Sequence, residues 1–553
     1  MKKTVLSVLA IVITASVTMA QTVEDGIKFL YYERNKSAVE TLQKVVASKP
    51  NDAYSIYWLG QAYLNYDKIN DAKTLYQKAL QNGVNDPLIW VGSAHADIVS
   101  GGDINAAKQK FEQAITATKG KKGVENADIL NAVGRANAAS GSKYGDPLYA
   151  IAKLKRAAEI DTKNPEIDVN LAINYLKLGS EHGGEAVEAL RDAIVRNPQY
   201  ARAYTRIGRI YRSQDNKESM NEWYGKAIAA DPSYGPVYLD YFNYYQNRDV
   251  NEAKGYLDKY VANADQDCQT DYFAADYLFR AGKYKESLDK ANAMANTCKD
   301  FPRLNILYAF NYDRLGDLPK AKSSLEAFFT SIAPEKITSD DYIFAGTVLA
   351  KIQGSEDAAV SDLLKGVELD TVRENKINYL KTTAKILDSL QRFDQELLIQ
   401  AKIASLKKKV EEFDYYRMGT TAIKAKNYKA ADSIGSIYIA TYPDKPQGYT
   451  FRVTAAKALD ADTSKGLAID PINQYNDFLA KATKDTAATK KLIFRNYYYL
   501  LFYYNDHAKD LNKSIEVLDK MLVLYPDAGE EHDFADKTKQ ALQAALKKKG
   551  SGK

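Results

Sequence analysis

Small and apolar residues occupy a regular set of positions in residues 201–234. With Ala201 counted as position 1, position 8 is Gly208, position 24 is Tyr224 and position 32 is Pro232. A glycine lets two helices approach closely, a large ring fills the space between neighbouring units, and a proline cannot continue a helix. The segment therefore predicts two packed helices, the second of which ends before Pro232. Further core positions of this unit are Ile207, Tyr211, Met220 and Ala227.

The same pattern returns along most of the chain with a spacing of about 34 residues. A period of this length indicates stacked helix pairs, although 553 residues would otherwise suggest several globular domains. We expect an all-α fold with about thirteen or fourteen repeats. Clear units lie at 53–86, 166–200, 301–334, 412–445 and about 491–526, Gly26 to Pro50 is in register before them, and weaker units lie near 87–122, 123–165, 235–267, 268–300, 338–371, 373–408 and 446–485.

The unit at 201–234 resembles the tetratricopeptide repeat, whose signature carries a Gly, a Tyr, an aromatic residue, an Ala and a Pro at the same places. The resemblance covers nearly the whole chain after residue 20. It implies a right-handed superhelical solenoid that binds other proteins and has the first helix of each pair on its concave face. The long turn at 459–471 and the run at 271–287 also resemble tetratricopeptide proteins exported by Bacteroidetes.

We divide the expected solenoid into two arrays, 21–267 and 268–526, followed by a capping helix and a basic tail at 527–553. A repeat array needs a terminal element with a polar outer face, because the last repeat would otherwise expose its apolar side. The spacing at 530–547 predicts such a helix, with Phe534, Leu542 and Leu546 facing inward.

The first twenty residues have the three parts of a secretory signal. Lys2 and Lys3 form a basic start, an apolar stretch follows, and small residues up to Ala20 predict cleavage before Gln21. No Cys follows the apolar stretch, which excludes the lipoprotein route. We therefore expect residues 1–20 to be removed and the mature chain to be periplasmic, peripheral to the outer membrane.

The charge of the chain favours neither nucleic acid nor a membrane surface as a partner. Removal of residues 1–20 takes away two Lys and no acidic residue, so the formal net charge falls from +5 to +3. A charge this small on a long chain gives no general attraction to polyanions. No later segment approaches the roughly eighteen consecutive apolar residues of a membrane span, so we expect no direct membrane insertion.

No motif in the sequence supports catalysis. The four histidines have no His partner four residues away, and there is no CxxC, phosphate-binding loop or nucleophile elbow. Carboxylate pairs such as Asp340 with Asp341 stand where helices begin, where a negative charge is favourable. We therefore expect a protein that is not an enzyme and has no metal site and no cofactor.

The two cysteines are placed to form a disulfide. Cys268 precedes the first helix of its repeat and Cys298 follows the second, so an antiparallel hairpin brings both to the same end. A disulfide requires Cα atoms within about 7 Å, which the base of such a hairpin supplies. The alternative is a pair of free thiols at helix ends. Because an exported protein meets an oxidising compartment, we expect the bond.

Arginines collect at the positions that face the groove in the resembled family. Residues 201–234 place Arg202, Arg209 and Arg212 there, with Arg206 beside them. Arg presents a planar fork of donors that matches carboxylates, so the cluster is a candidate site for an acidic partner. The alternative is a solvated face paired with Glu185, Glu188 and Asp192.

A more specific resemblance is to the chaperone-binding tetratricopeptide domains, which hold a peptide's terminal carboxylate with Lys, Asn and Arg from three successive repeats. Arg202, Arg206 and Asn170 match that pattern in character. Asn131 and Arg135 stand where that family has Lys and Asn, so the match is incomplete. A terminal-carboxylate clamp and a looser groove for an acidic segment both remain open.

Tyrosine is unusually frequent, with 41 residues, and forms runs such as 496–505. A helix that is apolar on every side must be buried on more than one face, and Tyr suits partly wet interfaces. We therefore predict a periplasmic protein-binding scaffold, a soluble component of an envelope or outer-membrane complex for assembly, secretion or uptake. The alternative is a glycan-binding accessory protein with a Tyr-lined groove, and a catalytic domain hidden in the weaker repeats is the least favoured reading.

Overall fold

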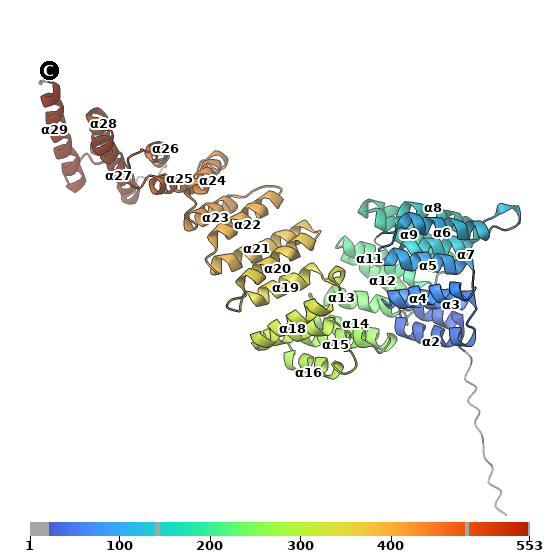
Figure 1. Ribbon diagram of the computed structural model, residues 1–553. Coiled ribbons are helices and arrows are strands. Elements are labelled where there is room, and N and C mark those ends of the chain that lie inside the picture. Colours follow the sequence, from blue (N-terminus) through green and yellow to red (C-terminus); the bar gives the residue numbers. More distant parts are fainter. Residues whose placement is uncertain (1–20, 139–143, 482–485, 551–553) are drawn as a thin grey trace, which may run out of the picture. The chain divides into compact units, whose positions relative to one another are not determined.

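The computed structural model describes residues 21–138, 144–481 and 486–550. In this part of the chain there are 29 α-helices and no β-strand (Figure 1). The helical repeat solenoid expected from the sequence is therefore confirmed. The expected signal segment, residues 1–20, lies outside the described residues, and export stays a prediction.

In chain order, the helices α1 to α28 make fourteen successive pairs over the described residues, in register with the predicted repeats. The chain divides into two compact units between Leu315 and Gly316. The boundary that we expected after residue 267 lies inside the first unit, where α15 packs on α14.

The first unit contains α1 (Val23–Tyr31), α2 (Asn35–Ser48), α3 (Ala53–Asn65), α4 (Ile69–Gln81), α5 (Pro87–Val99), α6 (Ile104–Ala117), α7 (Ala127–Ala138), α8 (Pro147–Ile160), α9 (Pro165–Leu178), α10 (Gly183–Arg196), α11 (Ala201–Ser213), α12 (Lys217–Ala230), α13 (Gly235–Tyr245), α14 (Val250–Asn263), α15 (Cys268–Arg280), α16 (Tyr284–Met294) and α17 (Arg303–Leu315). The second unit contains α18 (Leu318–Ser331), α19 (Ser339–Leu349), α20 (Glu356–Leu369), α21 (Arg373–Ser389), α22 (Phe393–Leu406), α23 (Glu412–Lys424), α24 (Tyr428–Thr441), α25 (Pro446–Leu459), α26 (Ile469–Lys481), α27 (Ala487–Phe502), α28 (Leu511–Leu524) and α29 (Glu530–Gly550).

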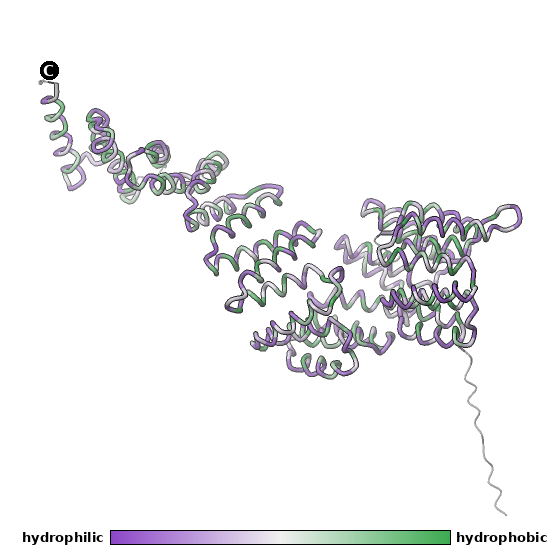
Figure 2. The backbone as a smooth tube through the Cα atoms, in the orientation of Figure 1, coloured by the Kyte–Doolittle hydropathy of each residue, from purple (hydrophilic) through white to green (hydrophobic). Residues whose placement is uncertain are grey.

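The packing inside a pair follows the predicted positions. In the pair α11–α12, a Cβ atom added at Gly208 would lie 2.3 Å from the ring of Tyr224, which is fully buried. In α3–α4, a Cβ atom at Gly60 would lie 2.1 Å from the ring of Tyr76. Only glycine permits this approach, so the glycine at position 8 and the ring at position 24 act together. Hydrophobic positions recur along the helices in the same rhythm (Figure 2).

The closing helix α29 forms as predicted, but only part of its expected inner face is buried. Leu542 packs against the core formed with α27 and α28, and Ala535 is fully buried. Phe534 and Leu546 remain 37% and 36% exposed, which corrects our expectation for both. Phe534 lies beside the buried stripe, and Leu546 lies beyond the end of α28, which is 14 residues long against 21 for α29.

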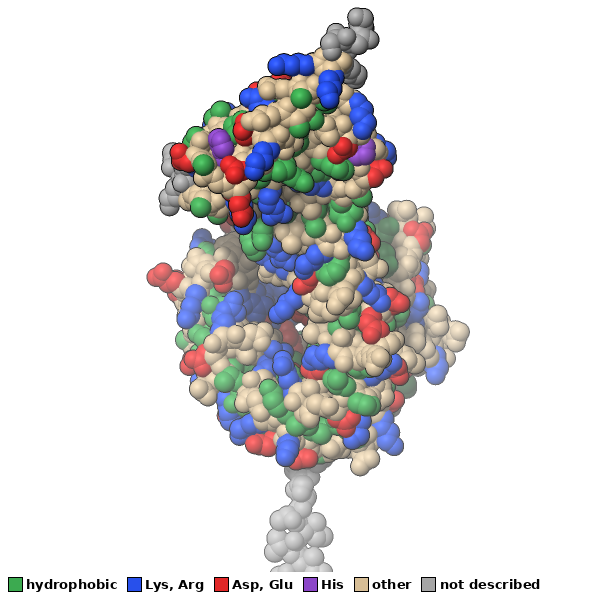
Figure 3. All heavy atoms as spheres, turned by 90° about the vertical axis from the view of Figure 1, so that its left-hand side faces the viewer, with side chains coloured by type: hydrophobic (Ala, Val, Ile, Leu, Met, Phe, Trp, Pro, Cys, Tyr) green, Lys and Arg blue, Asp and Glu red, His purple; other side chains and the backbone are tan. Residues whose placement is uncertain are grey.

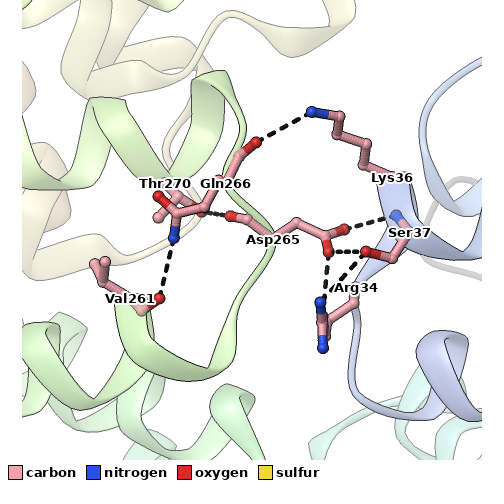
Figure 4. A network of polar contacts seen from close by, with 7 residues as sticks. All are labelled: Arg34, Lys36, Ser37, Val261, Asp265, Gln266 and Thr270. Atoms are coloured by element: carbon pink, nitrogen blue, oxygen red, sulfur yellow. Dashed lines mark hydrogen bonds and ion pairs between the residues drawn. The ribbon is translucent and has the colours of Figure 1, made fainter. Parts of the chain in front are cut away.

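The N-terminal repeat of the first unit contacts its later repeats through a polar cluster (Figure 4). The Asp265 carboxylate accepts hydrogen bonds from Arg34 Nε at 3.2 Å and from the Ser37 backbone N–H at 3.0 Å, as well as from the Ser37 hydroxyl. Lys36 donates to the Gln266 carbonyl at 3.2 Å. We call these five residues the clasp. Because it joins positions about 230 residues apart, it ties the first helix pair of the unit to the turn after α14.

Aromatic rings support the clasp. The ring of Tyr31, at the end of α1, lies with its centroid 5.1 Å from the centroids of both Tyr200 and Tyr234. These two tyrosines stand in the turns before α11 and α13, so the start of the chain packs against two later repeats. Tilted and edge-on ring pairs at this separation add to the stability that burial supplies.

Replacing Asp265 by alanine is expected to open the clasp. Asp265 is 7% exposed and Ser37 and Arg34 would lose their acceptor, so the contact should weaken by about 1–3 kcal/mol. Hydrogen–deuterium exchange of the full chain should then be faster in α1 and α2. Asp289→Ala, on the exposed side of α16, is the control that should leave the exchange of α1 and α2 unchanged. Equal exchange in both variants would mean that the clasp does not hold the first repeat.

Candidate functional site

A groove of about 1480 Å³ lies within the first unit. Its lining comes mainly from the first helices of six successive pairs, α1, α3, α5, α7, α9 and α11, and includes Glu33 and Asn35 next to the clasp. The candidate residues predicted from the sequence line this groove, with the exception of Arg212. Arg212 instead bonds to Asp240. The structure brings together Asn131, Arg135, Asn170, Arg202, Arg206 and Arg209 in the lining of this groove.

Arg202 is neutralised by a carboxylate on the neighbouring repeat. Its Nη1 atom lies 2.9 Å from Oε1 of Glu166 at the start of α9, and the Tyr200 hydroxyl donates to the same carboxylate. Burial alone would raise the pKa of Glu166, but the charges of Arg202 and Arg135 outweigh it, and the pKa is lowered. Glu166 is therefore a charged partner, and Arg202 is not available as a free cation.

Arg209 and Arg212 share a second carboxylate. Arg209 Nε lies 2.5 Å from Oδ2 of Asp240, and Arg212 Nη1 lies 3.2 Å from Oδ1. Asp240 belongs to α13 and is 5% exposed. Burial raises the pKa of Asp240 in spite of the two guanidinium groups. The two arginines satisfy Asp240, and the group of Arg209, Arg212 and Asp240 has one more positive charge than negative.

Arg206 has no ion pair and no hydrogen-bond acceptor among the residues that the structure describes. Its Nε atom is buried. Burial, together with the charges of Arg202 and Arg209, lowers the pKa of Arg206 to about 10. A cation removed from water without a partner is unfavourable, so Arg206 is the group in the groove that an anion would stabilise most.

The remaining candidate residues are already engaged. Asn170 Nδ2 donates to Asn131 Oδ1 at 2.9 Å, and both side chains are buried. Arg135 donates to the Tyr57 hydroxyl at 3.0 Å and lies 4.7 Å above the ring of Trp58. The two asparagines therefore bond to each other, and the set that resembles a terminal-carboxylate clamp does not present them to a ligand together.

The acids that pair with the arginines are not those expected from the sequence. Glu166 and Asp240 lie on α9 and α13, the first helices on either side of α11 in the repeat order, and Glu166 also lines the groove. Glu185 instead bonds to His182 in the turn before α10. The missed signal was the repeat position: acids on neighbouring first helices reach the arginines of α11, whereas Glu185, Glu188 and Asp192 belong to the second helix α10.

Other chemistry is sparse in the described part of the chain. It contains no cluster of three or more His, Cys, Asp or Glu that could hold a metal ion. His95 is buried against Gln61, and burial lowers its pKa to about 3, so it is neutral. Among the described residues, no helix combines the length and apolar character needed to cross a bilayer. Figure 3 shows acidic and basic side chains interspersed over one face.

The predicted disulfide is present. Cys268, at the start of α15, is bonded to Cys298, which follows α16, and their Cα atoms are 5.7 Å apart. The bond closes the base of one helix pair in the first unit, as the repeat register implied.

Comparison with known proteins gives several similarities. A mouse protein, interferon-induced protein with tetratricopeptide repeats 3, is 27% identical over 90 residues, which is 16% of this chain and 22% of that relative's length. A C-terminal part of a repeat protein from Cytophaga hutchinsonii is 22% identical, covers 47% of this chain and 98% of its own, and has a TM-score of 0.27. A human IFIT1 dimer described with PPP-AAAA is 17% identical, covers 76% of this chain and 96% of its own, and has a TM-score of 0.42.

The family model of the tetratricopeptide repeat matches residues 201–234, the unit in which the pattern is clearest. In other pairs the same close approach is made by a glycine on the first helix and a large side chain on the second, as for Gly26 with Leu42 and Gly134 with Leu154. The chain therefore contains a tetratricopeptide repeat at residues 201–234 within a helical repeat solenoid.

Proposed function

We propose that the protein is an exported, periplasmic scaffold that binds another protein, as a soluble component of an envelope or outer-membrane complex. In this proposal the groove of the first unit holds an acidic segment of the partner. The observation that carries it is Arg206, a buried guanidinium without a counter-charge between two arginines that have one. A scaffold role also accords with the repeat fold, because solenoids present extended surfaces on which exposed residues bind a partner.

The geometry around Arg206 favours a carboxylate as the bound group. Arg202 and Arg209 are held in place by Glu166 and Asp240, so the free fork of Arg206 is presented on a fixed support. Guanidinium groups bind carboxylates with two parallel hydrogen bonds, and such bonds are about twice as strong as neutral ones. Rings of Tyr54 and Trp58 line the same groove and supply apolar contact there.

Replacing Arg206 by glutamine should weaken the binding of a fluorescein-labelled poly-aspartate peptide to the full chain at least about tenfold, because a hydrogen bond to a charged group contributes about 1.5–3 kcal/mol. Fluorescence anisotropy at two salt concentrations measures the loss. Arg191→Gln removes the same charge from the exposed face of α10 and is the matched control. Equal affinity of both variants would contradict the proposal. If the chain bound neutral oligosaccharides and not the acidic peptide, the glycan alternative would be favoured.

The thermal stability of variants distinguishes an arginine that binds a ligand from one that stabilises the fold. Arg206→Gln removes an uncompensated buried charge and should not lower the thermal midpoint of the chain. Arg202→Gln leaves Glu166 buried without its cation and should lower that midpoint. If Arg206→Gln lowers the thermal midpoint, Arg206 stabilises the fold and is not reserved for a partner.

The proposed location rests on the sequence. The signal pattern at residues 1–20, the linkers that resemble exported Bacteroidetes proteins and the disulfide all support an oxidising compartment outside the cytoplasm. N-terminal sequencing of the chain from a periplasmic fraction should begin at Gln21. Crosslinking and mass spectrometry in those cells should then recover a partner with the wild type and less of it with Arg206→Gln.

A further inference from the structure

The second unit has a cavity of its own, with a volume of about 560 Å³. It lies between α25 and α27, the first helices of the last two pairs, and also contacts Tyr475 of α26. A volume of this size is in the range that holds a few side chains or one small molecule. Its position on first helices corresponds to that of the groove in the first unit.

Two cations in this cavity have no carboxylate partner among the described residues. Lys457 Nζ lies 4.9 Å from the centre of the Tyr499 ring, and Arg495 stands on the next first helix. Burial and the charge of Arg495 together lower the pKa of Lys457. The Tyr499 hydroxyl is buried and has no hydrogen-bond partner. Three donors therefore line one cavity, and an anion bound there would contact the exposed Arg495 and give the buried Tyr499 hydroxyl an acceptor.

The wall next to these donors is aromatic and open. Tyr498 is 54% exposed and Phe502 is 45% exposed, and the two rings are four residues apart on one face of α27. Large exposed rings beside unpaired cations are typical of the centre of a protein interface, where aromatic residues and Arg are enriched.

Two neutral polar groups of the cavity, Thr450 and Asn496, are already in use. Thr450 Oγ1 donates to the Pro446 carbonyl at 3.1 Å and can accept from the Tyr475 hydroxyl, which lies 3.3 Å away. Asn496 Nδ2 donates to Asn476 Oδ1 at 2.8 Å. A sugar, with several hydroxyl groups, would find few free partners here, whereas a carboxylate next to an apolar ring needs only the two cations, the Tyr499 hydroxyl and the aromatic wall.

We infer that this cavity is a second binding site, specific for a segment of a protein partner that carries a carboxylate beside an aromatic side chain. The carboxylate lies between Lys457 and Arg495 and accepts from Tyr499, and the ring packs on Tyr498 and Phe502. The inference rests on the protein-binding role proposed above, but it shares no residue with the groove around Arg206.

The test uses the full chain and labelled peptides whose central pair is Asp-Phe, Asn-Phe or Asp-Ala, with binding followed by fluorescence anisotropy. The Asp-Phe peptide should bind most tightly, and Lys457→Met and Arg495→Gln should each weaken its binding at least about tenfold. Phe502→Ser should lower the affinity for Asp-Phe to that for Asp-Ala. Lys491→Gln, an exposed cation of α27 outside the cavity, should change nothing.

Three results would overturn the inference: no binding of the Asp-Phe peptide, equal binding of Asn-Phe, or binding that Lys457→Met and Arg495→Gln leave intact. Preferential binding of a uronic-acid oligosaccharide that the same variants abolish would also overturn it in favour of an acidic glycan. Repeating the series in the Arg206→Gln background separates the two sites. The Asp-Phe peptide should still bind to the Arg206→Gln variant. A failure of the proposal for the Arg206 groove can therefore be distinguished from a failure of this second site.

Discussion

Replacing Tyr76 by alanine is expected to lower the free energy of unfolding around α3 to α5 by about 3–5 kcal/mol. The Tyr76 ring is fully buried between two glycines, Gly60 of its own pair and Gly92 of the next. A Cβ atom would lie 2.1 Å from the ring at the first and 2.4 Å at the second. Its hydroxyl donates to the Tyr57 carbonyl at 2.8 Å. Alanine would leave a cavity between two repeats and a carbonyl without its donor.

Hydrogen–deuterium exchange of the full chain is the suitable measurement, because a solenoid opens repeat by repeat and its global unfolding is not a single transition. Exchange should rise in α3, α4 and α5 and change little in the second unit. Tyr76→Phe keeps the ring and removes only the hydroxyl, so its effect should be about 1 kcal/mol. Similar exchange in the two variants would mean that the ring does not join the repeats.

Tyr76 also shows why the fold was predictable from the sequence. Glycine at position 8 and a ring at position 24 are local in each unit, and the contact that they make is repeated whenever the spacing is repeated. Periodicity therefore predicts the helix pairs without knowledge of any long-range contact. Where a helix has only one neighbour the same reasoning fails, as it did for Phe534 and Leu546 at the end of the array.

The clasp was not predictable in this way. Asp265 meets Arg34 and Ser37 only because seven repeats accumulate enough curvature to bring the start of the chain back to α14. That curvature is the sum of small rotations between repeats, and no motif in the sequence records it. A groove along the first helices was expected from the repeat pattern, whereas the contact between the first and the seventh repeat was not.

The sequence predicted that the arginines cluster, but it did not predict which of them have a counter-charge. Repeat positions placed Arg202, Arg206 and Arg209 on one face of α11. Which of them lacks a counter-charge depends on Glu166 and Asp240, which stand 36 residues before Arg202 and 31 residues after Arg209. The sequence therefore indicates an arginine-lined groove, and the structure selects Arg206 within it.

Removing the disulfide by Cys268→Ser is expected to lower the stability of the pair α15–α16 by about 3–4 kcal/mol, a value set by the loop that the bond closes. The cysteines are 30 positions apart, so the unfolded chain regains much of its freedom when the bond is lost. Cys298 is 4% exposed and belongs to a small core with Met294 and Leu304. A lone thiol would remain buried there.

The effect of the bond can be measured without a folding defect in the starting protein. Wild-type chain with and without reductant should show faster hydrogen exchange in α15 and α16 only when reduced. The double variant Cys268→Ser with Cys298→Ser should exchange fast in both conditions and show no response to reductant. If reductant loosens the double variant as much as the wild type, the change does not come from the bond. If the wild type does not respond while mass spectrometry shows two free thiols, the loop-closure account of this pair is wrong, because the core of the hairpin would then hold it without the bond.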